Sequence, residues 1–354
     1  MKDSRLGKLA EIMVEKSLAV KSGDVVVIRG PYEARPLVDE CFRAIIEKGA
    51  TPFFDLIVHD HSRLLVDIGS DEQYEKLNEI KLNIYEKTDC SITIDAPLNT
   101  RNMASAKSER NVAFTKALSP CIRELTSKRW VLTNFPTQSL AQEAEMSIDE
   151  YWDMFFDAVL IDYDKLDKQM DKVLKTFDKG NDVRIIGKNT DLSFSIKGRP
   201  GTKCSGVCNI PDGEVYYAPV EDSINGIIYY DFPIVRYGVQ VDNVQMEFQD
   251  GKVIAARSSN NEDFLNKILD TDPGARYIGE FGIGLNYGIK KYIKNILFDE
   301  KIGGTVHFAI GQAYEGSLGT NKSSIHWDMI KDLREDGEIY LDGVIVMKNG
   351  EWII

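Results

Sequence analysis

The first 136 residues alternate between apolar, β-branched segments and helix-length stretches, and this alternation limits the possible folds more than any other feature. Four segments rich in Val, Ile, Phe and Thr are each expected to form a strand: residues 24–30, 51–58, 90–97 and 129–136. Stretches with apolar residues at helical spacing precede or separate them: residues 4–20, 34–50, 71–88 and 105–128. Strands joined through helices of a dozen residues or more form a parallel sheet. We therefore predict an N-terminal doubly wound α/β domain.

The local sequence pattern changes after about residue 180. Residues 147–179 open with a serine N-cap and keep helical periodicity, which predicts one long closing helix. Beyond it, short β-rich segments and glycine-containing turns dominate, with one helical stretch around 259–270. We expect an α/β domain over residues 1–180 and a β-rich α+β domain over residues 181–354. Two domains also fit the length, because 354 residues exceed what one hydrophobic core supports.

Composition argues against several functional classes. The net charge of −13 disfavours nucleic-acid partners, which require a basic face. No run of about 18 apolar residues is present, and the charged N-terminal segment lacks a signal-peptide core, so we expect a cytoplasmic protein without a membrane span. Five scattered cysteines are expected to be reduced thiols. The turn after the first predicted strand, RGPYEARP, has a single glycine, which argues against a dinucleotide site.

His326 and Asp328 stand two residues apart in the segment SSIHWDMI, residues 323–330. Residues i and i+2 share a face of a strand but diverge in a helix. An extended segment therefore places both side chains on one face and the apolar side chains on the other. In GTVHFAIG, residues 304–311, the same alternation sets His307 among small residues.

Two further segments repeat this pattern with a carboxylate. Glu214 in GEVYYAPVED and Glu280 in IGEFGIGLN each lie opposite an apolar face of a predicted strand. Acids and imidazoles among small residues are typical of a cavity, and together they bind borderline divalent metals. The candidate metal ligands are Glu214, Glu280, His307, His326 and Asp328. Each of them alone is more often an ordinary polar residue, so this pattern leaves the reaction type open.

Other possible metal ligands are weaker. His59 and His61 flank Asp60 in VHDHSR, but they follow a strand of the first domain and are interpreted as loop residues. Cys204 and Cys208 are four residues apart, yet no second Cys or His pair has zinc-finger spacing. We therefore do not predict a metal site at either pair.

The blocks around the candidate ligands resemble, in order, those of the metallo-aminopeptidase family known as aminopeptidase T, or the thermophilic aminopeptidases. These blocks are IPDGEVYYAPVEDSINGII, GEFGIGLN, DEKIGGTVHFAIGQAY and NKSSIHWDMIKDLR. LAEIMVEKSLAVKSGDVVVIRGP and FPTQSLAQEAEMSIDEYW are similar too, so the resemblance covers nearly the whole chain.

The resemblance implies a two-metal exopeptidase that removes N-terminal residues from peptides. It implies zinc, cobalt or manganese ions, a homodimer, and an active site enclosed between the domains. The metal ligands of the family match Glu214, Glu280, His307, His326 and Asp328. Tyr314 matches a tyrosine that stabilises the tetrahedral intermediate, and we take Tyr314 and Glu280 as the candidate catalytic residues.

The chain departs from well-known members of this family, which makes it a divergent, shorter branch. Where they carry a further histidine, residues 284–287 read Gly-Leu-Asn-Tyr, and the segment between His307 and His326 is shorter. Two alternatives stay open. A two-metal phosphoesterase or amidohydrolase would need Lys or Arg near the metals, and the four blocks offer chiefly Lys301 and Lys322. The other alternative is a metal-binding relative without catalysis.

Overall fold

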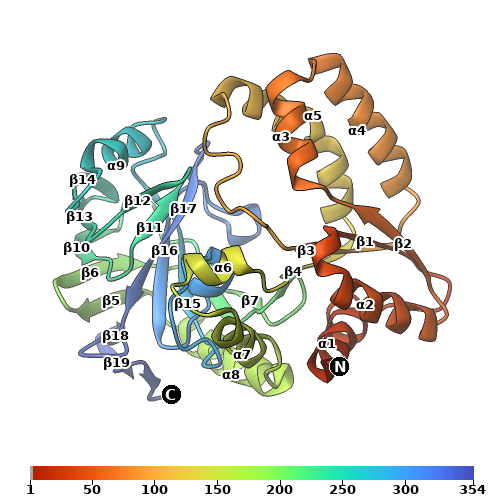
Figure 1. The fold of residues 1–354 in the computed structure, drawn as a ribbon. Helices are drawn as coiled ribbons and strands as arrows, with labels where there is room; N and C mark the ends of the chain where they lie inside the picture. Colours follow the sequence, from red (N-terminus) through yellow and green to blue (C-terminus); the bar gives the residue numbers. More distant parts are fainter. Residues whose placement is uncertain (1–2) are drawn as a thin grey trace. The chain divides into compact units, whose positions relative to one another are not determined.

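The computed structural model describes residues 3–354, which divide into two compact units (Figure 1). Unit 1 contains the residues up to Leu160 together with Gly206–Pro211, and unit 2 contains Ile161–Ser205 and Asp212–Ile354. The chain therefore enters unit 2, returns to unit 1 for one short segment, and enters unit 2 again. Within the described residues, no helix combines the length and apolarity needed to cross a membrane.

Unit 1 is built on the predicted parallel sheet. Its strands are β1 (Val25–Gly30), β2 (Thr51–Leu56), β3 (Cys90–Asp95), β4 (Arg129–Asn134) and the short β8 (Asn209–Ile210). They follow the order β2-β1-β3-β4-β8, and every neighbouring pair is parallel. The sequence of the first half predicts the first four strands, whereas β8 comes from the segment that returns from unit 2.

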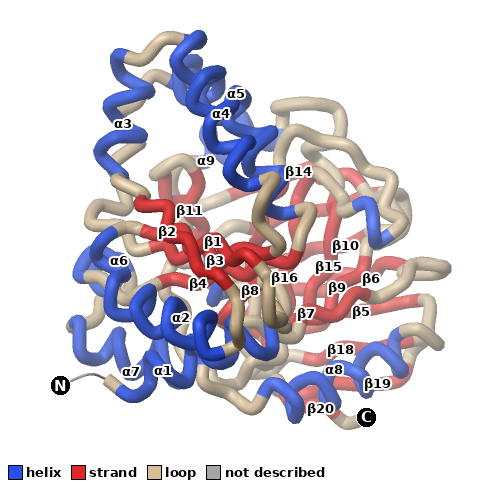
Figure 2. Tube along the Cα trace, turned by 90° about the vertical axis from the view of Figure 1, so that its right-hand side faces the viewer, coloured by secondary structure: helices blue, strands red, loops and turns tan. Residues whose placement is uncertain are grey.

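Helices cover both faces of this sheet (Figures 1 and 2). The helices of unit 1 are α1 (Ser4–Glu11) with the π-helical turn Ile12–Ser17, α2 (Arg35–Glu47), α3 (His59–Ile68), α4 (Asp71–Tyr85), α5 (Ser108–Thr126), α6 (Gln138–Glu143) and α7 (Ile148–Val159). Val27 of β1 joins Tyr85 of α4 and Leu125 of α5 in one buried cluster. The α/β class expected from the sequence is confirmed.

Two local predictions in the first 180 residues are wrong. His59 and His61 are not loop residues, because α3 begins at His59 and includes both. The periodic stretch 147–179 is two helices, α7 and α8 (Tyr163–Phe177). Asp162 Oδ1 accepts hydrogen bonds from the backbone N–H groups of Asp164 and Lys165, so it caps a new helix. Hydrophobic periodicity alone does not show where such a cap interrupts a helix.

Unit 2 is dominated by strands, drawn red in Figure 2. An eight-stranded antiparallel sheet has the order β14 (Lys252–Arg257), β13 (Gln245–Gln249), β10 (Asn225–Tyr229), β6 (Thr190–Ser195), β5 (Asp182–Gly187), β18 (Glu338–Leu341), β19 (Val344–Lys348) and β20 (Glu351–Trp352). A five-stranded antiparallel sheet has the order β17 (His326–Asp332), β16 (Thr305–Gly311), β15 (Ile278–Gly284), β9 (Glu214–Tyr217) and β7 (Thr202–Cys204). A ribbon of β11 (Ile234–Arg236) and β12 (Val239–Val241), and helices α8, α9 (Glu262–Leu269) and α10 (Ile296–Asp299), complete the unit. The β-rich second domain is therefore confirmed.

One face of the five-stranded sheet forms an aromatic core. Phe281 of β15 stacks on Phe308 of β16 with ring centroids 5.3 Å apart. Phe194 of β6 meets these rings edge-on at 4.9 and 5.5 Å, which joins the two sheets. Phe177 of α8 stacks on Tyr217 of β9 at 5.9 Å. Because this face is fixed by packing, the alternate residues of the same strands must point to the opposite face.

Candidate metal centre

That opposite face of the five-stranded sheet carries all the predicted metal ligands. They are Glu214 of β9, Glu280 of β15, His307 of β16, and His326 and Asp328 of the edge strand β17. Ala309 is the Cα partner of both Glu280 and Asp328, and Gly282 is the partner of His307. Residues paired across antiparallel strands share a face, so the register gathers these side chains on one side of the sheet.

Glu214, Glu280 and His307 form a buried group of three potential ligands. The imidazole of His307 has no exposed surface, and its Nε2 lies 3.2 Å from Glu280 Oε1 and 3.4 Å from Glu214 Oε2. Ligand atoms that are each about 2.1 Å from one ion lie roughly 3.0–3.4 Å apart at octahedral or tetrahedral angles. The spacing of the three side chains therefore fits a divalent ion.

Buried polar atoms of the same three residues support this fit. Among the described residues, Glu214 Oε2, Glu280 Oε2 and His307 Nδ1 have no hydrogen-bond partner. A buried carboxylate oxygen without a partner is costly, and a cation at the group would remove that cost. His307 Nδ1 departs from the usual arrangement, in which the second nitrogen of a ligating histidine donates to a carbonyl or carboxylate group.

Gly282 provides the space that the imidazole of His307 occupies. A Cβ atom at Gly282 would lie 2.0 Å from both Cε1 and Nε2 of the His307 ring. Any side chain at this position would therefore displace the imidazole from Glu280. The sequence pattern assigned this small residue to a cavity, but the imidazole of His307 fills the space beside it.

His326 and Asp328 form a second, two-ligand group. Their Nε2 and Oδ1 atoms are 3.5 Å apart, and His326 Nδ1 lies 2.8 Å from the carbonyl oxygen of Gln312. A carbonyl only accepts hydrogen bonds, so Nδ1 carries the proton and Nε2 of the neutral ring is free to bind an ion. Among the side chains that the structure describes, no third His, Cys or carboxylate atom lies within 4.8 Å of both.

The carboxylates around the two imidazoles change their protonation. Burial would lower the pKa of His307, but the hydrogen bond to Glu280 and the charge of Glu214 raise it to about 9. Burial would also lower the pKa of His326, but the hydrogen bond to Asp328 and its charge raise that pKa to about 9. Burial raises the pKa of Glu280 above its usual range despite the contact with His307. A divalent ion must therefore displace protons from both imidazoles.

Tyr314 lies beside the second group. Its ring centroid is 4.9 Å from that of His326 and 5.6 Å from that of Tyr216, and 49% of its surface is exposed. Burial of the hydroxyl and the nearby charges of Glu280 and Asp328 raise the pKa of Tyr314 above its usual value. The hydroxyl therefore remains a hydrogen-bond donor at neutral pH.

Lys301 belongs to the site, although the strand pattern does not include it. The side chain is fully buried, and its Nζ donates to Glu214 Oε1 at 3.0 Å and to Glu300 Oε1, with Asp212 Oδ1 3.9 Å away. Burial would lower the pKa of Lys301, but Glu214, Glu300 and Asp212 raise it well above its usual value. Lys301 lies in the loop between α10 and β16, where two-residue periodicity carries no information. In the sequence, only its position in the third block pointed to a place near the candidate ligands.

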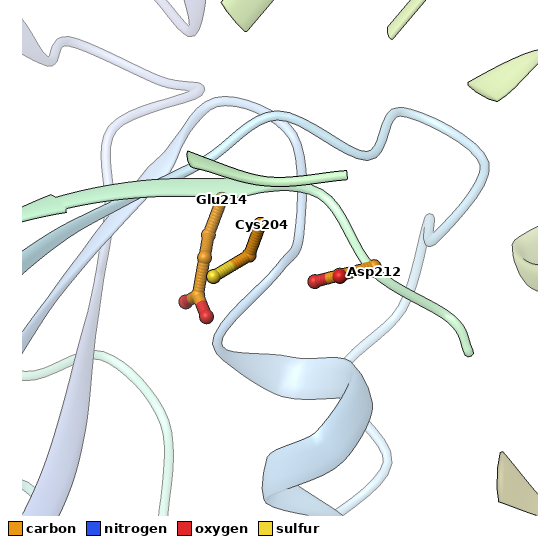
Figure 3. A group of neighbouring side chains, drawn as sticks. All are labelled: Cys204, Asp212 and Glu214. Carbon is orange, nitrogen blue, oxygen red and sulfur yellow. The ribbon is translucent and has the colours of Figure 1, made fainter. Parts of the chain in front are cut away.

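Cys204, Asp212 and Glu214 form another group of potential ligands, all within 4.8 Å of one another (Figure 3). Cys204 of β7 and Glu214 of β9 are Cα partners, and Asp212 precedes β9. Figure 3 shows Cys204 and Asp212 directed toward Glu214. Burial raises the pKa of the Cys204 thiol, and the charges of Glu214 and Asp212 raise it further. The sequence pattern did not identify Cys204 or Asp212 as part of the site.

The residues at the positions where well-known family members carry a further histidine make structural contacts. Leu285 is buried and donates its backbone N–H to Gly213 O at 2.7 Å. Asn286 Nδ2 donates to Asp212 O at 2.9 Å, and Asn286 Oδ1 accepts from Gly288 N at 2.9 Å. These residues hold the turn that carries Asp212, and the apolar side chain of Leu285 offers no metal ligand.

Comparison with known proteins identifies the family. Residues 2–352 match the family model described as thermophilic metalloprotease (M29). Aminopeptidase 2 of Geobacillus stearothermophilus is 24% identical over 409 residues, covering 99% of this chain and 98% of that protein. Aminopeptidase T of Thermus thermophilus is 24% identical over 405 residues with the same coverage. The solved structure titled wild-type AmpT from Thermus thermophilus covers 99% of both chains with a TM-score of 0.85 at 22% identity, so it has the same fold. The resemblance of the sequence blocks is thus confirmed, and the chain belongs to the thermophilic metalloprotease family M29.

Proposed function

We propose that this protein is a metal-dependent aminopeptidase that hydrolyses N-terminal residues from peptides. The observation that carries the proposal is the buried group of Glu214, Glu280 and His307, whose spacing fits a divalent ion. Membership of a metalloprotease family makes peptide hydrolysis the reaction to expect there. The relatives named aminopeptidases support a preference for free N-termini.

Two divalent ions, of zinc, cobalt or manganese, are part of the proposal. Glu214, Glu280 and His307 would hold the first, while His326 and Asp328 would hold the second. In the sheet, Ala309 is the Cα partner of both Glu280 and Asp328, so Glu280 is the residue of the first group that lies in register with the second. Imidazole and carboxylate ligands suit these metals. When bound, such ions lower the pKa of a water molecule and polarise the scissile carbonyl group.

The side chains of the site would perform the remaining steps. Glu280 Oε2, which has no partner among the described residues, accepts the proton of the attacking water and returns it to the leaving amine. The hydroxyl of Tyr314 donates to the oxyanion of the tetrahedral intermediate. The surrounding carboxylates attract the free α-ammonium group of the substrate.

The decisive experiment compares unblocked and N-acetylated versions of the same peptides in the presence of Zn²⁺, Co²⁺ or Mn²⁺. We expect hydrolysis of only the unblocked peptides, with loss of activity after chelation. His326→Ala should reduce bound metal in elemental analysis, whereas His59→Ala in unit 1 serves as the matched control and should not. Equal cleavage of blocked peptides, or full metal content in His326→Ala, would contradict the proposal.

The alternatives have less support. A phosphoesterase needs a cationic side chain for its substrate, and Lys301 from the third sequence block cannot serve, because its ammonium is fully buried and already bonded to carboxylates. A relative that binds metal without catalysis would load ions and leave every peptide intact, which the same experiment distinguishes. We also propose the homodimer implied by family resemblance, and sedimentation equilibrium tests it.

A further inference from the structure

The ammonium of Lys301 occupies a position where a cation is held by protein groups on several sides. Its Nζ lies 3.0 Å from Glu214 Oε1, within hydrogen-bond distance of Glu300, and 3.9 Å from Asp212 Oδ1. Glu214 and Asp212 also form the three-ligand group with Cys204 that Figure 3 shows. Thiolate and carboxylate ligands at this spacing would hold zinc or cobalt if the space were free.

We propose that the ammonium of Lys301 takes the place of a metal ion beside Asp212 and Glu214. It thereby keeps the group of Cys204, Asp212 and Glu214 free of metal. A divalent ion bound to both carboxylates would lie against the ammonium. Their like charges would repel strongly in a site from which water is excluded. The ammonium therefore competes with a metal ion for the same carboxylates, and it has the advantage of being covalently attached.

The same contact determines how Glu214 can serve the catalytic centre. Lys301 engages Glu214 Oε1, whereas Glu214 Oε2 lies 3.4 Å from His307 Nε2. Only one oxygen of this carboxylate is therefore directed toward the group formed with Glu280 and His307. Lys301 thus acts as a positioning residue that makes Glu214 a single-oxygen ligand. This part of the inference rests on the proposed metal site, whereas the exclusion of metal from Cys204 does not.

The test replaces Lys301 with methionine and measures bound cobalt per chain. Methionine has a similar length and no charge, so Asp212, Glu214 and Glu300 lose their common counter-ion. We expect Lys301→Met to bind one more cobalt ion per chain than the unaltered protein. Binding should release the thiol proton of Cys204 and produce the near-ultraviolet charge-transfer absorption of a cobalt–thiolate bond. The double variant Lys301→Met/Cys204→Ser should lose that absorption.

Lys331→Met is the matched control. Lys331 is also fully buried, but its Nζ contacts the single carboxylate of Asp231 at 2.7 Å and the carbonyl oxygen of Lys188 at 3.2 Å. Its removal also leaves a partly buried carboxylate without its cation, yet it should neither add a metal ion nor produce thiolate absorption. Thermal unfolding with and without cobalt provides a second measurement, and only Lys301→Met should gain additional stabilisation from the ion.

Lys301→Gln, which keeps a hydrogen-bond donor, covers the case in which Lys301→Met folds only with cobalt or not at all. Unchanged stoichiometry in a folded variant, or failure of both variants to fold and load an extra ion, overturns the inference. A cobalt–thiolate absorption in the unaltered protein overturns it as well. None of these measurements uses peptide hydrolysis. An inactive protein whose Lys301→Met variant gains the thiolate-bound ion would therefore refute the proposed function and leave the inference intact.

Discussion

At the scale of single residues, the proposed role of Tyr314 depends on one oxygen atom. Its ring lies beside that of His326, which places Tyr314 next to the second group of proposed ligands. We expect Tyr314→Phe to keep normal metal content and KM but to lose about two orders of magnitude in kcat. A donor used only in the transition state affects kcat alone. Tyr32→Phe, at an exposed position of unit 1, is the control. If the kcat of Tyr314→Phe is within about threefold of that of the unaltered enzyme, the hydroxyl has no catalytic role and Tyr314 only lines the site.

The two histidines lead to a prediction about pH. The pKa of His307 and that of His326 are about 9 without metal, above the unfolded value of about 6.5. Protonation of these rings therefore stabilises the metal-free fold fully below about pH 6.5, and this contribution is lost as pH rises through 9. Metal affinity should increase by up to about tenfold per pH unit for each imidazole that must lose a proton. Thermal unfolding of chelated and metal-loaded protein between pH 6.5 and 9 should show a widening difference in Tm. A constant difference would contradict this view of the histidines.

At the scale of elements, Gly282 is the test of how β15 and β16 position His307. A Cβ atom at Gly282 would lie 2.0 Å from the imidazole ring, so Gly282→Ala must move His307 away from Glu280. We expect this variant to remain folded but to lose at least about tenfold in metal affinity, as measured by chelator competition. Gly7→Ala is the control, because its Cβ would meet only Glu40 Oε2 at 3.9 Å. Unchanged metal affinity in Gly282→Ala would mean that His307 is not a ligand.

The strands of the site were predictable from the sequence because each obeys a two-residue period. Packing of Phe281 and Phe308 fixes one face of β15 and β16, so Glu280 and His307 have to lie on the other. Strand periodicity could not predict that Lys301 belongs to the site, because Lys301 lies in a loop, which has no regular period. Only the folded structure shows which carboxylates surround it. The break after α7 was missed for a related reason: a cap at Asp162 interrupts hydrogen bonding without interrupting the apolar pattern.

At the scale of the whole molecule, the order of chain segments was only partly predictable. The sequence predicts a parallel sheet followed by a β-rich part, and both exist. It did not reveal that Gly206–Pro211 returns to unit 1 and adds β8 beside β4. A two-residue strand has too few positions to display a period, and its partner is distant in the sequence. Local patterns therefore predict elements well, whereas pairings over long sequence separations are known only after folding.

The division into two units gives a prediction for metal removal. All the proposed metal ligands belong to unit 2, where they come from β9, β15, β16 and β17. Without ions, the neighbouring carboxylates of these strands repel one another, whereas the parallel sheet of unit 1 contributes no ligand. We expect chelation to increase backbone hydrogen exchange in these four strands and to leave β1, β3 and β4 nearly unchanged.

The magnitude of this effect follows from mass action. An ion present at about 100 times its Kd stabilises the unit that binds it by about 2.7 kcal/mol. That corresponds to roughly a hundredfold increase in exchange from fully opened states of unit 2 after chelation. His326→Ala should already have part of this increase before chelation, and chelation should then change its exchange less than that of the unaltered protein. An equal loss of protection in both units would show that the ions stabilise the whole chain through a route other than these ligands, and the assignment of the metal centre to the five-stranded sheet would fail.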